Sequence, residues 1–217
     1  MILKNKWYSN FMFSKQVDSS HYEFGRYMSK ARWNSLWHQI DEVTRLKPKS
    51  ILEIGPGAGA FKAITNIVGL HTETLDIDPE LKPDHISSVF NIPFQDNTYD
   101  VVCAFQMLEH LPYEKSLKAF GEMVRVAKRN IIVSLPDSKP LWSYSVYLPR
   151  LGLVKWLLPR PFFRRKKHIF DGEHYWEINK RDFPIEKICT DLGVHALLVK
   201  TYRVHENSYH RFFVFEK

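Results

Sequence analysis

The feature that most constrains this chain is a short apolar segment followed by three glycines at alternate positions, Gly55, Gly57 and Gly59. The apolar residues 51–54 predict a buried strand, and apolar positions after the glycines recur at helical spacing. Pro56 stiffens the turn between the two elements. A strand that turns through glycines into a helix brings backbone N–H groups close to a ligand. The run therefore predicts an α/β domain with a nucleotide-type binding loop.

The spacing of the glycines admits two kinds of ligand. Gly55, Gly57 and Ala60 satisfy the dinucleotide pattern, in which the third position is glycine or alanine. Gly59 in place of Ala60 gives a tighter pattern of alternate glycines. Glu53 helps to decide, because a carboxylate at the strand end repels a pyrophosphate and attracts an ammonium group. The loop therefore favours a nucleotide-like ligand that carries an amino-acid moiety.

Glu53 and the three glycines read Glu-x-Gly-x-Gly-x-Gly, which resembles the first motif of the class I S-adenosylmethionine-dependent methyltransferases. The resemblance implies an α/β, Rossmann-like fold with a mostly parallel seven-stranded sheet, an antiparallel terminal strand and helices on both faces. It also implies S-adenosylmethionine as the cofactor. Gly55, Gly57 and Gly59 are then expected against its methionine moiety, with Glu53 against its ammonium group.

Further residues of the cofactor site follow along the chain. Residues 72–79 read as a second strand that ends in acid, and Asp76 lies about 20 residues beyond the loop, where a carboxylate accepts both hydroxyls of a ribose. Ile77 follows it and is expected at the cofactor as well. Ser88 stands where many relatives have an aspartate for the adenine, for which the backbone of the following residues is the alternative. Gln106 stands where relatives often have an acid beside the methionine end.

Residues 106–112, Gln-Met-Leu-Glu-His-Leu-Pro, resemble the fourth-motif region of small-molecule methyltransferases. They follow the apolar run 101–105, which predicts a strand buried on both faces whose carboxyl end meets the ligand. His110 titrates near neutral pH, so it is one candidate for the base that takes a proton from the acceptor. The alternative is that Glu109 and His110 only cap the next helix.

A second distinctive stretch, residues 168–178, reads His-Ile-Phe-Asp-Gly-Glu-His-Tyr-Trp-Glu-Ile. Its histidines and acids match no known ligand spacing, so we predict no metal site. We expect His168, Glu173 and Tyr175 to bind the substrate, and His174 is the second candidate base. The alternative is a polar loop whose aromatic side chains only anchor it.

The chain has 217 residues, enough to bury one sizeable core, and we predict a single domain. Residues 1–25 are predicted to be a loosely structured arm or a short helix. A cap helix over 27–47 precedes a cofactor-binding core over 49–136. An insertion over 137–181 is followed by a closing helix and hairpin over 182–217.

The cap helix has one apolar face, and its spacing predicts that Trp33 and Trp37 pack against the sheet. In the methyltransferases that the chain resembles, a helix before the first motif often covers the cofactor. We therefore expect Tyr27 and Arg32 to approach the site.

The insertion interrupts the alternation of strands and helices that predicts the parallel sheet. Its residues 141–163 are rich in Trp, Tyr, Leu and Pro, and a basic cluster follows at 164–168. A cover over the substrate cavity is the first interpretation, and a membrane-interface segment over 141–168 is the second. A nucleic-acid surface ranks third, because the apolar part precedes the basic part instead of alternating with it. The net charge of +7 fits an anionic partner.

The two cysteines, Cys103 and Cys189, lie in apolar contexts and read as reduced residues of a cytoplasmic protein. We therefore predict a cytoplasmic methyltransferase, with peripheral membrane contact under the second interpretation of the insertion. Its acceptor is an O or N nucleophile of a small, anionic or lipid-linked molecule. The sequence leaves the oligomeric state open.

Two other functions are compatible with the same residues. One is an NAD-dependent oxidoreductase, which the dinucleotide pattern and Asp76 also allow. Glu53 and the closing hairpin speak against it. The other is a non-catalytic protein that keeps the fold as a binding scaffold.

Overall fold

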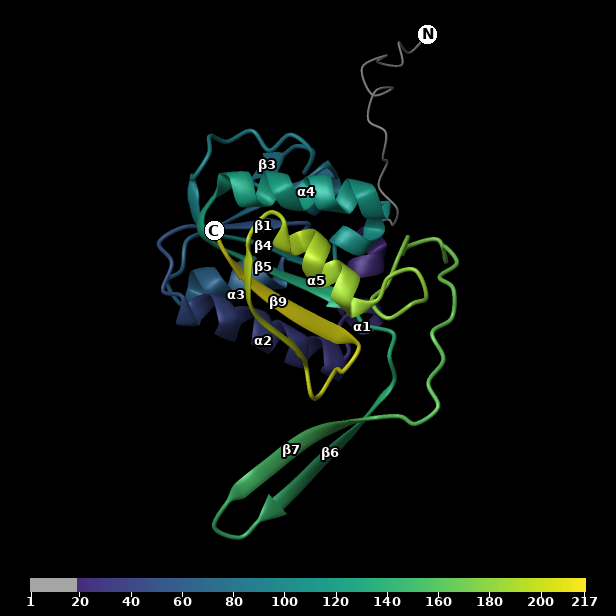
Figure 1. The fold of residues 1–217 in the computed structure, drawn as a ribbon. Coiled ribbons are helices and arrows are strands. Elements are labelled where there is room, and N and C mark those ends of the chain that lie inside the picture. The colour runs from purple at the N-terminus through teal and green to yellow at the C-terminus, as the bar shows by residue number, and fades with distance from the viewer. Residues whose placement is uncertain (1–18) are drawn as a thin grey trace.

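The computed structural model describes residues 19–217, which form one seven-stranded sheet and a separate two-stranded sheet. The strand order of the large sheet is β3-β2-β1-β4-β5-β9-β8 (Figure 1). The first five strands in this order, from β3 to β5, pair in parallel with their neighbours. Strand β9 is antiparallel to both β5 and β8. The predicted fold is thereby confirmed. The strands are β1 (Ile51–Ile54), β2 (Thr72–Asp76), β3 (His85–Ile86), β4 (Tyr99–Phe105), β5 (Ala127–Pro136), β6 (Leu141–Leu148), β7 (Gly152–Pro159), β8 (Leu197–Arg203) and β9 (His210–Glu216).

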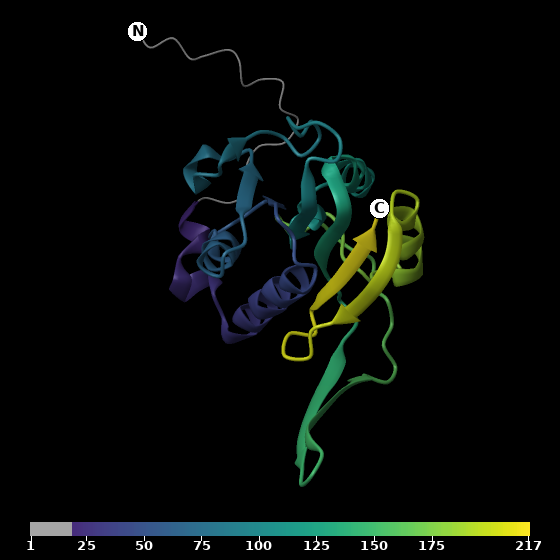
Figure 2. The same ribbon diagram turned by 90° about the vertical axis from the view of Figure 1, so that its left-hand side faces the viewer.

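Helices cover both faces of the large sheet, as the two views in Figures 1 and 2 show. Helices α2 and α3 contribute to one buried cluster, and α4 and α5 contribute to the other. No helix among the described residues is long and apolar enough to cross a membrane. The helices are α1 (Phe24–Tyr27), α2 (Lys30–Arg45), α3 (Ala60–Ile67), α4 (Tyr113–Val126) and α5 (Ile185–Gly193), with 3-10 turns η1 (Ser19–Tyr22), η2 (Pro79–Leu81) and η3 (Leu108–His110).

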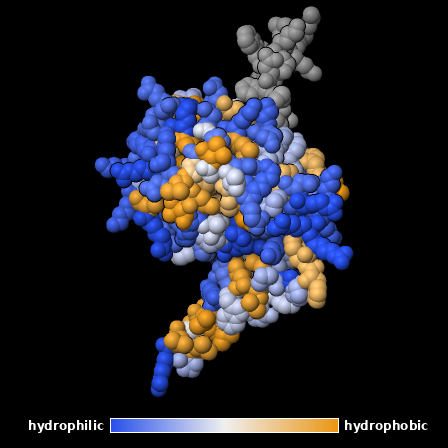
Figure 3. Space-filling view, in the orientation of Figure 1, coloured by the Kyte–Doolittle hydropathy of each residue, from blue (hydrophilic) through white to orange (hydrophobic). Residues whose placement is uncertain are grey.

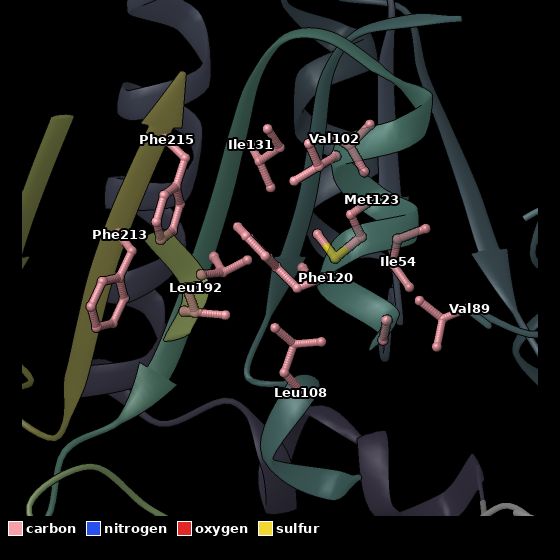
Figure 4. Close-up of a cluster of buried hydrophobic side chains, with 14 of the residues drawn as sticks. Ile54, Val89, Val102, Leu108, Phe120, Met123, Ile131, Leu192, Phe213 and Phe215 are labelled. Atoms are coloured by element: carbon pink, nitrogen blue, oxygen red, sulfur yellow. The ribbon is translucent and has the colours of Figure 1, made fainter. Parts of the chain in front are cut away.

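The larger buried cluster fixes the strands that carry the site (Figure 4). Phe120 and Met123 of α4 and Leu192 of α5 meet the strands there, and Phe120 packs 4.9 Å from Phe215 of β9, measured between ring centroids. Strands β1 and β4 are buried along almost their whole length and mostly apolar, as expected for parallel strands with helices on both faces. Their carboxyl ends therefore meet at one edge of the sheet, where the glycine loop begins.

Helix α2 lies within the span 27–47 that was predicted for the cap helix, but the prediction for its two tryptophans is wrong. Trp33 and Trp37 are 50% and 57% exposed, whereas Leu36 and Val43 are buried. The apolar stripe of the helix is wider than the surface it can contact. The small Ser35 packs inward beside Leu36, and the indoles are left on the flank. Residues 1–18 of the predicted arm lie outside the described residues, and η1 and α1 follow them.

The insertion forms a β-hairpin that the sequence pattern did not predict. Strands β6 and β7 pair over eight residues each and project away from the rest of the molecule (Figure 1). The first interpretation of the insertion, a cover over the cavity, is therefore wrong for this apolar half. Only the later part, around residues 170–175, reaches the cavity described below.

Candidate active site

A cavity of about 910 Å³ lies at the carboxyl edge of the parallel strands. The residues after β1, β2 and β4 line it, which is where an open α/β sheet binds its ligand. Two predicted site residues, Gly59 and His168, are not part of its lining. The predicted residues that line it are Glu53, Gly55, Gly57, Asp76, Ile77, Ser88, Gln106, His110, Glu173, His174 and Tyr175.

The glycine loop is in close contact with two neighbouring side chains. A Cβ atom on Gly55 would lie 2.6 Å from Cγ of Met107, and one on Gly57 would lie 3.0 Å from Cε1 of Tyr22. Both glycines have positive φ, so no other residue fits either position without strain. Gly59 also has positive φ, but no atom approaches its missing side chain, and it is the N-cap of α3. Its role is therefore local: it allows the turn that starts the helix.

Glu53 is a buried acid without a full set of partners. Its side chain is 3% exposed, and Oε2 has no hydrogen-bond partner among the described residues. Burial raises the pKa of its carboxyl to about 8, and Lys62 opposes this shift. A buried carboxylate is stable only when a cation or hydrogen-bond donor compensates it. Because Glu53 lines the cavity, a cationic group of a ligand bound there would compensate the carboxylate.

Asp76 and Ser88 line the cavity beyond the loop, and both also stabilise turns. The N–H of Asp78 donates to Oδ1 of Asp76 (2.8 Å), and the N–H of Phe90 donates to Oγ of Ser88 (3.2 Å). Burial raises the pKa of Asp76, although the bond from Asp78 opposes the shift. Ile77 is exposed beside this carboxylate and gives the site an apolar edge.

Gln106 adopts a strained backbone conformation at the end of β4. Its φ is 53°, in the left-handed region that residues other than glycine rarely adopt. Its N–H donates to the carbonyl of Ser134 (2.9 Å), and its side-chain amide donates to Oγ of the same residue (3.2 Å). Strand β5 thus holds Gln106 in place on the cavity wall.

His110 and His174, the two candidate bases, lie side by side with their ring centroids 5.1 Å apart. Burial and the neighbouring His174 lower the pKa of His110. Burial alone would lower the pKa of His174, but its hydrogen bond to Glu177 (3.2 Å) and the nearby Glu109 raise it. His110 is therefore the more readily neutral ring and His174 the more readily charged one. The N–H at Nδ1 of His110 donates to the carbonyl of Glu173 (3.0 Å), which makes Nε2 the basic nitrogen.

The loop that carries His174 is bound tightly to η3. The N–H of Tyr175 donates to the carbonyl of Glu109 (2.9 Å), and the indole N–H of Trp176 donates to the carbonyl of Leu111 (3.1 Å). His168 donates from Nε2 to the carbonyl of His174 (2.8 Å). His168 therefore supports the backbone of His174. It does not line the cavity, where it was predicted to bind the substrate.

The cavity also contains residues that sequence reasoning missed. Tyr22 comes from the region without a clear pattern, and its ring packs 5.0 Å from that of Tyr27. His210 lies in an apolar strand, where nothing in the pattern marked it. It is buried with Nδ1 unpartnered among the described residues, and burial together with Arg32 lowers its pKa to about 3. The expected approach of Tyr27 and Arg32 is confirmed, with the guanidinium of Arg32 4.3 Å from the Tyr27 ring centroid.

Comparison with known proteins decides between the functions that this geometry allows. Residues 24–181 match the profile of a family described as a methyltransferase domain. The chain belongs to this methyltransferase family. Membership of this family fits a methyltransferase that uses S-adenosylmethionine, and it sets aside the NAD-dependent oxidoreductase.

Individual relatives agree with the fold. An uncharacterised protein of Methanocaldococcus jannaschii is 36% identical over 85 residues, which is 36% of this chain and 36% of that protein. A methyltransferase of Aquifex aeolicus has a TM-score of 0.57 at 16% identity, over 92% of this chain and 98% of that one. The 1,6-didemethyltoxoflavin-N1-methyltransferase of Burkholderia thailandensis, solved with S-adenosylhomocysteine, has a TM-score of 0.58 at 14% identity, over 91% and 84%. At these identities the two structures show a shared fold.

The methyltransferase's own residues fit S-adenosylmethionine. The cofactor supplies an electrophilic methyl group on a sulfonium, together with an ammonium and a ribose. The unpartnered carboxyl of Glu53 matches the ammonium, and the missing side chains of Gly55 and Gly57 leave backbone exposed beside it. Asp76 at the next strand end matches the ribose.

Two groups of side chains have the composition of metal ligands. Ligand atoms of Glu109, His110 and His174 lie within 4.8 Å of one another, as do those of Asp171, His174 and Glu177. The fold brings the first group together from two separate segments, so its spacing in the sequence gave no signal. The second group lies within the stretch 168–178, whose spacing matches no known ligand pattern. The absence of a metal site stays a prediction.

The raised pKa of Glu53 predicts that cofactor binding releases a proton. Below about pH 8 the ligand-free carboxyl carries a proton, and an ammonium ligand favours its ionised form. Calorimetry with S-adenosylhomocysteine at pH 7, in buffers of different ionisation enthalpy, should show release of a proton on binding. The affinity should rise with pH and level off above about pH 8.

A variant separates this effect from other titrations. Glu53→Gln should bind more weakly and release no proton, because the amide does not titrate. Wild-type protein that releases no proton at pH 7 would show that Glu53 does not pair with the ammonium.

Proposed function

We propose that the enzyme transfers the methyl group of S-adenosylmethionine to an O or N nucleophile of a small acceptor, and that His110 accepts the acceptor's proton. The observation that carries this proposal is the pair of imidazoles on the cavity wall, 5.1 Å apart, whose surroundings shift their pKa values in opposite directions. A neutral imidazole at neutral pH is a suitable general base for a hydroxyl or an amine.

The two histidines have different parts in this proposal. The sulfonium methyl is electrophilic by itself, so the protein mainly has to align the nucleophile and remove its proton. His110 supplies Nε2 as the base. His174 positions the site: Glu177 fixes its ring, and its positive charge keeps His110 deprotonated. Glu173 and Tyr175, which flank His174 on the same loop, are proposed to bind the acceptor.

The lining of the cavity supports an acceptor with negative charge. Arg32 on the first turn of α2 and Lys115 on the first turn of α4 both line it. An anionic group of the acceptor, including the phosphate of a lipid-linked molecule, would pair with these cations. The cytoplasmic location remains a prediction.

Substitution of the histidines tests the proposal. His110→Ala should lower kcat by roughly 10²- to 10⁴-fold, the usual effect of losing a general base, with affinity for S-adenosylhomocysteine within about twofold of wild type. His174→Ala should shift the acid limb of the pH–rate profile to higher pH, because the charge that lowers the pKa of His110 is gone. The measurement is conversion of S-adenosylmethionine to S-adenosylhomocysteine with acceptors from water-soluble and lipid fractions of a cell extract.

His71→Ala is the matched control, because this exposed histidine lies outside the cavity and pairs only with Glu73 in the described structure. It should leave both kcat and the pH profile unchanged. Wild-type turnover in His110→Ala would exclude His110 as the base. An unshifted acid limb in His174→Ala would exclude the positioning role of His174.

A further inference from the structure

The β6–β7 hairpin is attached to the domain body (the seven-stranded sheet and its helices) at one place. Its hydrogen bonds to the described part of the body all go to the turn between β8 and β9. Oγ of Ser143 donates to the carbonyl of His205 (3.0 Å), and Nε2 of His205 donates to the carbonyl of Tyr144 (2.8 Å). Lys155 forms an ion pair with Glu206 (2.6 Å). Beyond these contacts the hairpin projects on its own (Figures 1 and 2).

One face of the hairpin is apolar from end to end. Residues paired directly across two antiparallel strands share a face, and the register places seven apolar side chains on one of them. Each is between 36% and 45% exposed, and Figure 3 shows the hydrophobic surface along the projecting hairpin. A two-stranded hairpin is marginally stable in water unless its apolar face is covered. The residues of this face are Trp142, Tyr144, Val146, Leu148, Val154, Trp156 and Leu158.

The positive charge of the chain is concentrated in the same segment. Residues 138–170 contain eight lysines and arginines and no aspartate or glutamate. The rest of the chain therefore holds 31 − 8 = 23 basic side chains against all 24 acidic ones. Arg150 lies in the turn at the tip, and the cluster 164–167 follows the hairpin. Cations thus flank the apolar face at both ends.

This combination selects among possible partners. Two copies joined through their hairpins would bring eight cations against eight, at a cost in repulsion. A nucleic acid would neutralise the cations but leave the continuous apolar face in water. An anionic lipid surface satisfies both, because tryptophan and tyrosine rings lie among the headgroups while lysine and arginine pair with the lipid phosphates.

We propose that the hairpin and the basic cluster 164–167 bind the methyltransferase to the surface of an anionic membrane. The outer edges of a two-stranded sheet carry unpaired backbone groups, which limits the hairpin to the interfacial region of the bilayer. The chain continues from the basic cluster into Phe170, Glu173 and His174 of the cavity wall. Membrane binding is thereby connected to the acceptor side of the active site, a link that rests on the proposed function.

Sedimentation of the whole protein with vesicles tests the proposal. Wild type should bind vesicles of phosphatidylcholine mixed with phosphatidylglycerol, and should bind pure phosphatidylcholine or the mixed vesicles at about 0.5 M salt at least tenfold more weakly. Arg164→Glu/Lys166→Glu/Lys167→Glu should lower binding at least roughly 100-fold, since each lost cation at an anionic surface contributes about a fivefold factor and the new carboxylates are repelled. Trp142→Ser/Trp156→Ser should lower it at least about tenfold.

Lys49→Glu/Lys118→Glu/Arg129→Glu is the matched control, because it makes the same change of net charge at exposed positions outside the insertion. Its binding to the mixed vesicles should fall by less than about fivefold, as expected for a change in overall charge alone. Equal losses in the two triple variants, or no binding of wild type at low salt, would overturn the proposal. So would a dimer in analytical ultracentrifugation that depends on Trp142 and Trp156 and does not bind vesicles.

Affinity for S-adenosylhomocysteine separates this proposal from the proposed function. Every variant should keep wild-type affinity, which also shows that it is folded. Loss of vesicle binding with intact cofactor binding and turnover of a soluble acceptor supports the membrane proposal alone. Failure of His110→Ala to reduce turnover would leave the vesicle result unaffected.

Discussion

Replacement of Asp76 by alanine should reduce affinity for S-adenosylhomocysteine by at least about 100-fold in calorimetry. The carboxylate is expected to accept both ribose hydroxyls, and hydrogen bonds to a charged group contribute about 1.5–3 kcal/mol each. Loss of two such bonds costs about 3–6 kcal/mol, and each 1.4 kcal/mol is about a factor of ten. Asp76 lines the cavity at the end of β2, the position that this role requires.

Two further variants make the result specific. Asp76→Asn keeps a carbonyl oxygen for the N–H of Asp78 but loses the charge, so its affinity should fall between those of wild type and alanine. Asp96→Ala removes an exposed aspartate that pairs with Arg125 outside the cavity, and it should bind as wild type does. Unchanged affinity in Asp76→Ala would exclude the ribose role.

Replacement of Asp137 by alanine should lower the free energy of unfolding by about 3–5 kcal/mol. Asp137 is buried where the insertion leaves β5, and its oxygens accept hydrogen bonds from Arg211 (2.8 Å) and Asn179 (2.8 Å). It also pairs with Arg203 (3.3 Å), whose side chain is almost fully buried. Burial lowers the pKa of Arg203 to about 10, and Asp137 opposes that shift. Without Asp137, the guanidinium stays buried and uncompensated.

Thermal unfolding measures this effect. A loss of 3–5 kcal/mol in a domain of this size corresponds to a fall in Tm of roughly 6–20 °C. Asp41→Ala, which breaks the helical surface pair with Arg45, should change the free energy of unfolding by less than about 0.5 kcal/mol. Asp137→Ala/Arg203→Leu should recover part of the loss, because the unpaired charge is removed. If the free energy of unfolding of Asp137→Ala lay within about 1 kcal/mol of wild type, Asp137 would not be the compensating charge for buried Arg203.

The residues predicted for the cofactor side could be brought together at one cavity from the sequence, because they lie in short continuous segments. Glu53 lies in β1, Gly55 and Gly57 follow that strand, and Asp76 ends β2. In a parallel sheet the carboxyl ends of neighbouring strands meet at one edge, so knowing the strands was enough to bring these residues together. Gly59 shows the limit of the pattern, because the same spacing serves a helix start as well as a ligand.

The acceptor half depends on contacts between segments that are far apart in the chain. The pairing of His110 with His174, and the support that His168 gives from behind, follow from the docking of one loop on η3. Periodicity does not report such docking. For the same reason it placed Trp33 and Trp37 inside, although α2 has more apolar side chains than the sheet can cover.

By itself, the sequence determined the fold class and the position of the cofactor loop, because local patterns encode strands, helices and the turns between them. Its resemblance to the class I methyltransferases indicated the cofactor. It also showed that residues 141–168 combine apolar and basic side chains. Only the tertiary structure decided that its residues 141–159 form a projecting hairpin and not a cover for the cavity. The reason is that strand pairing and burial depend on which surfaces meet, and the apolar pattern of β6 and β7 is the same whether or not another layer covers it.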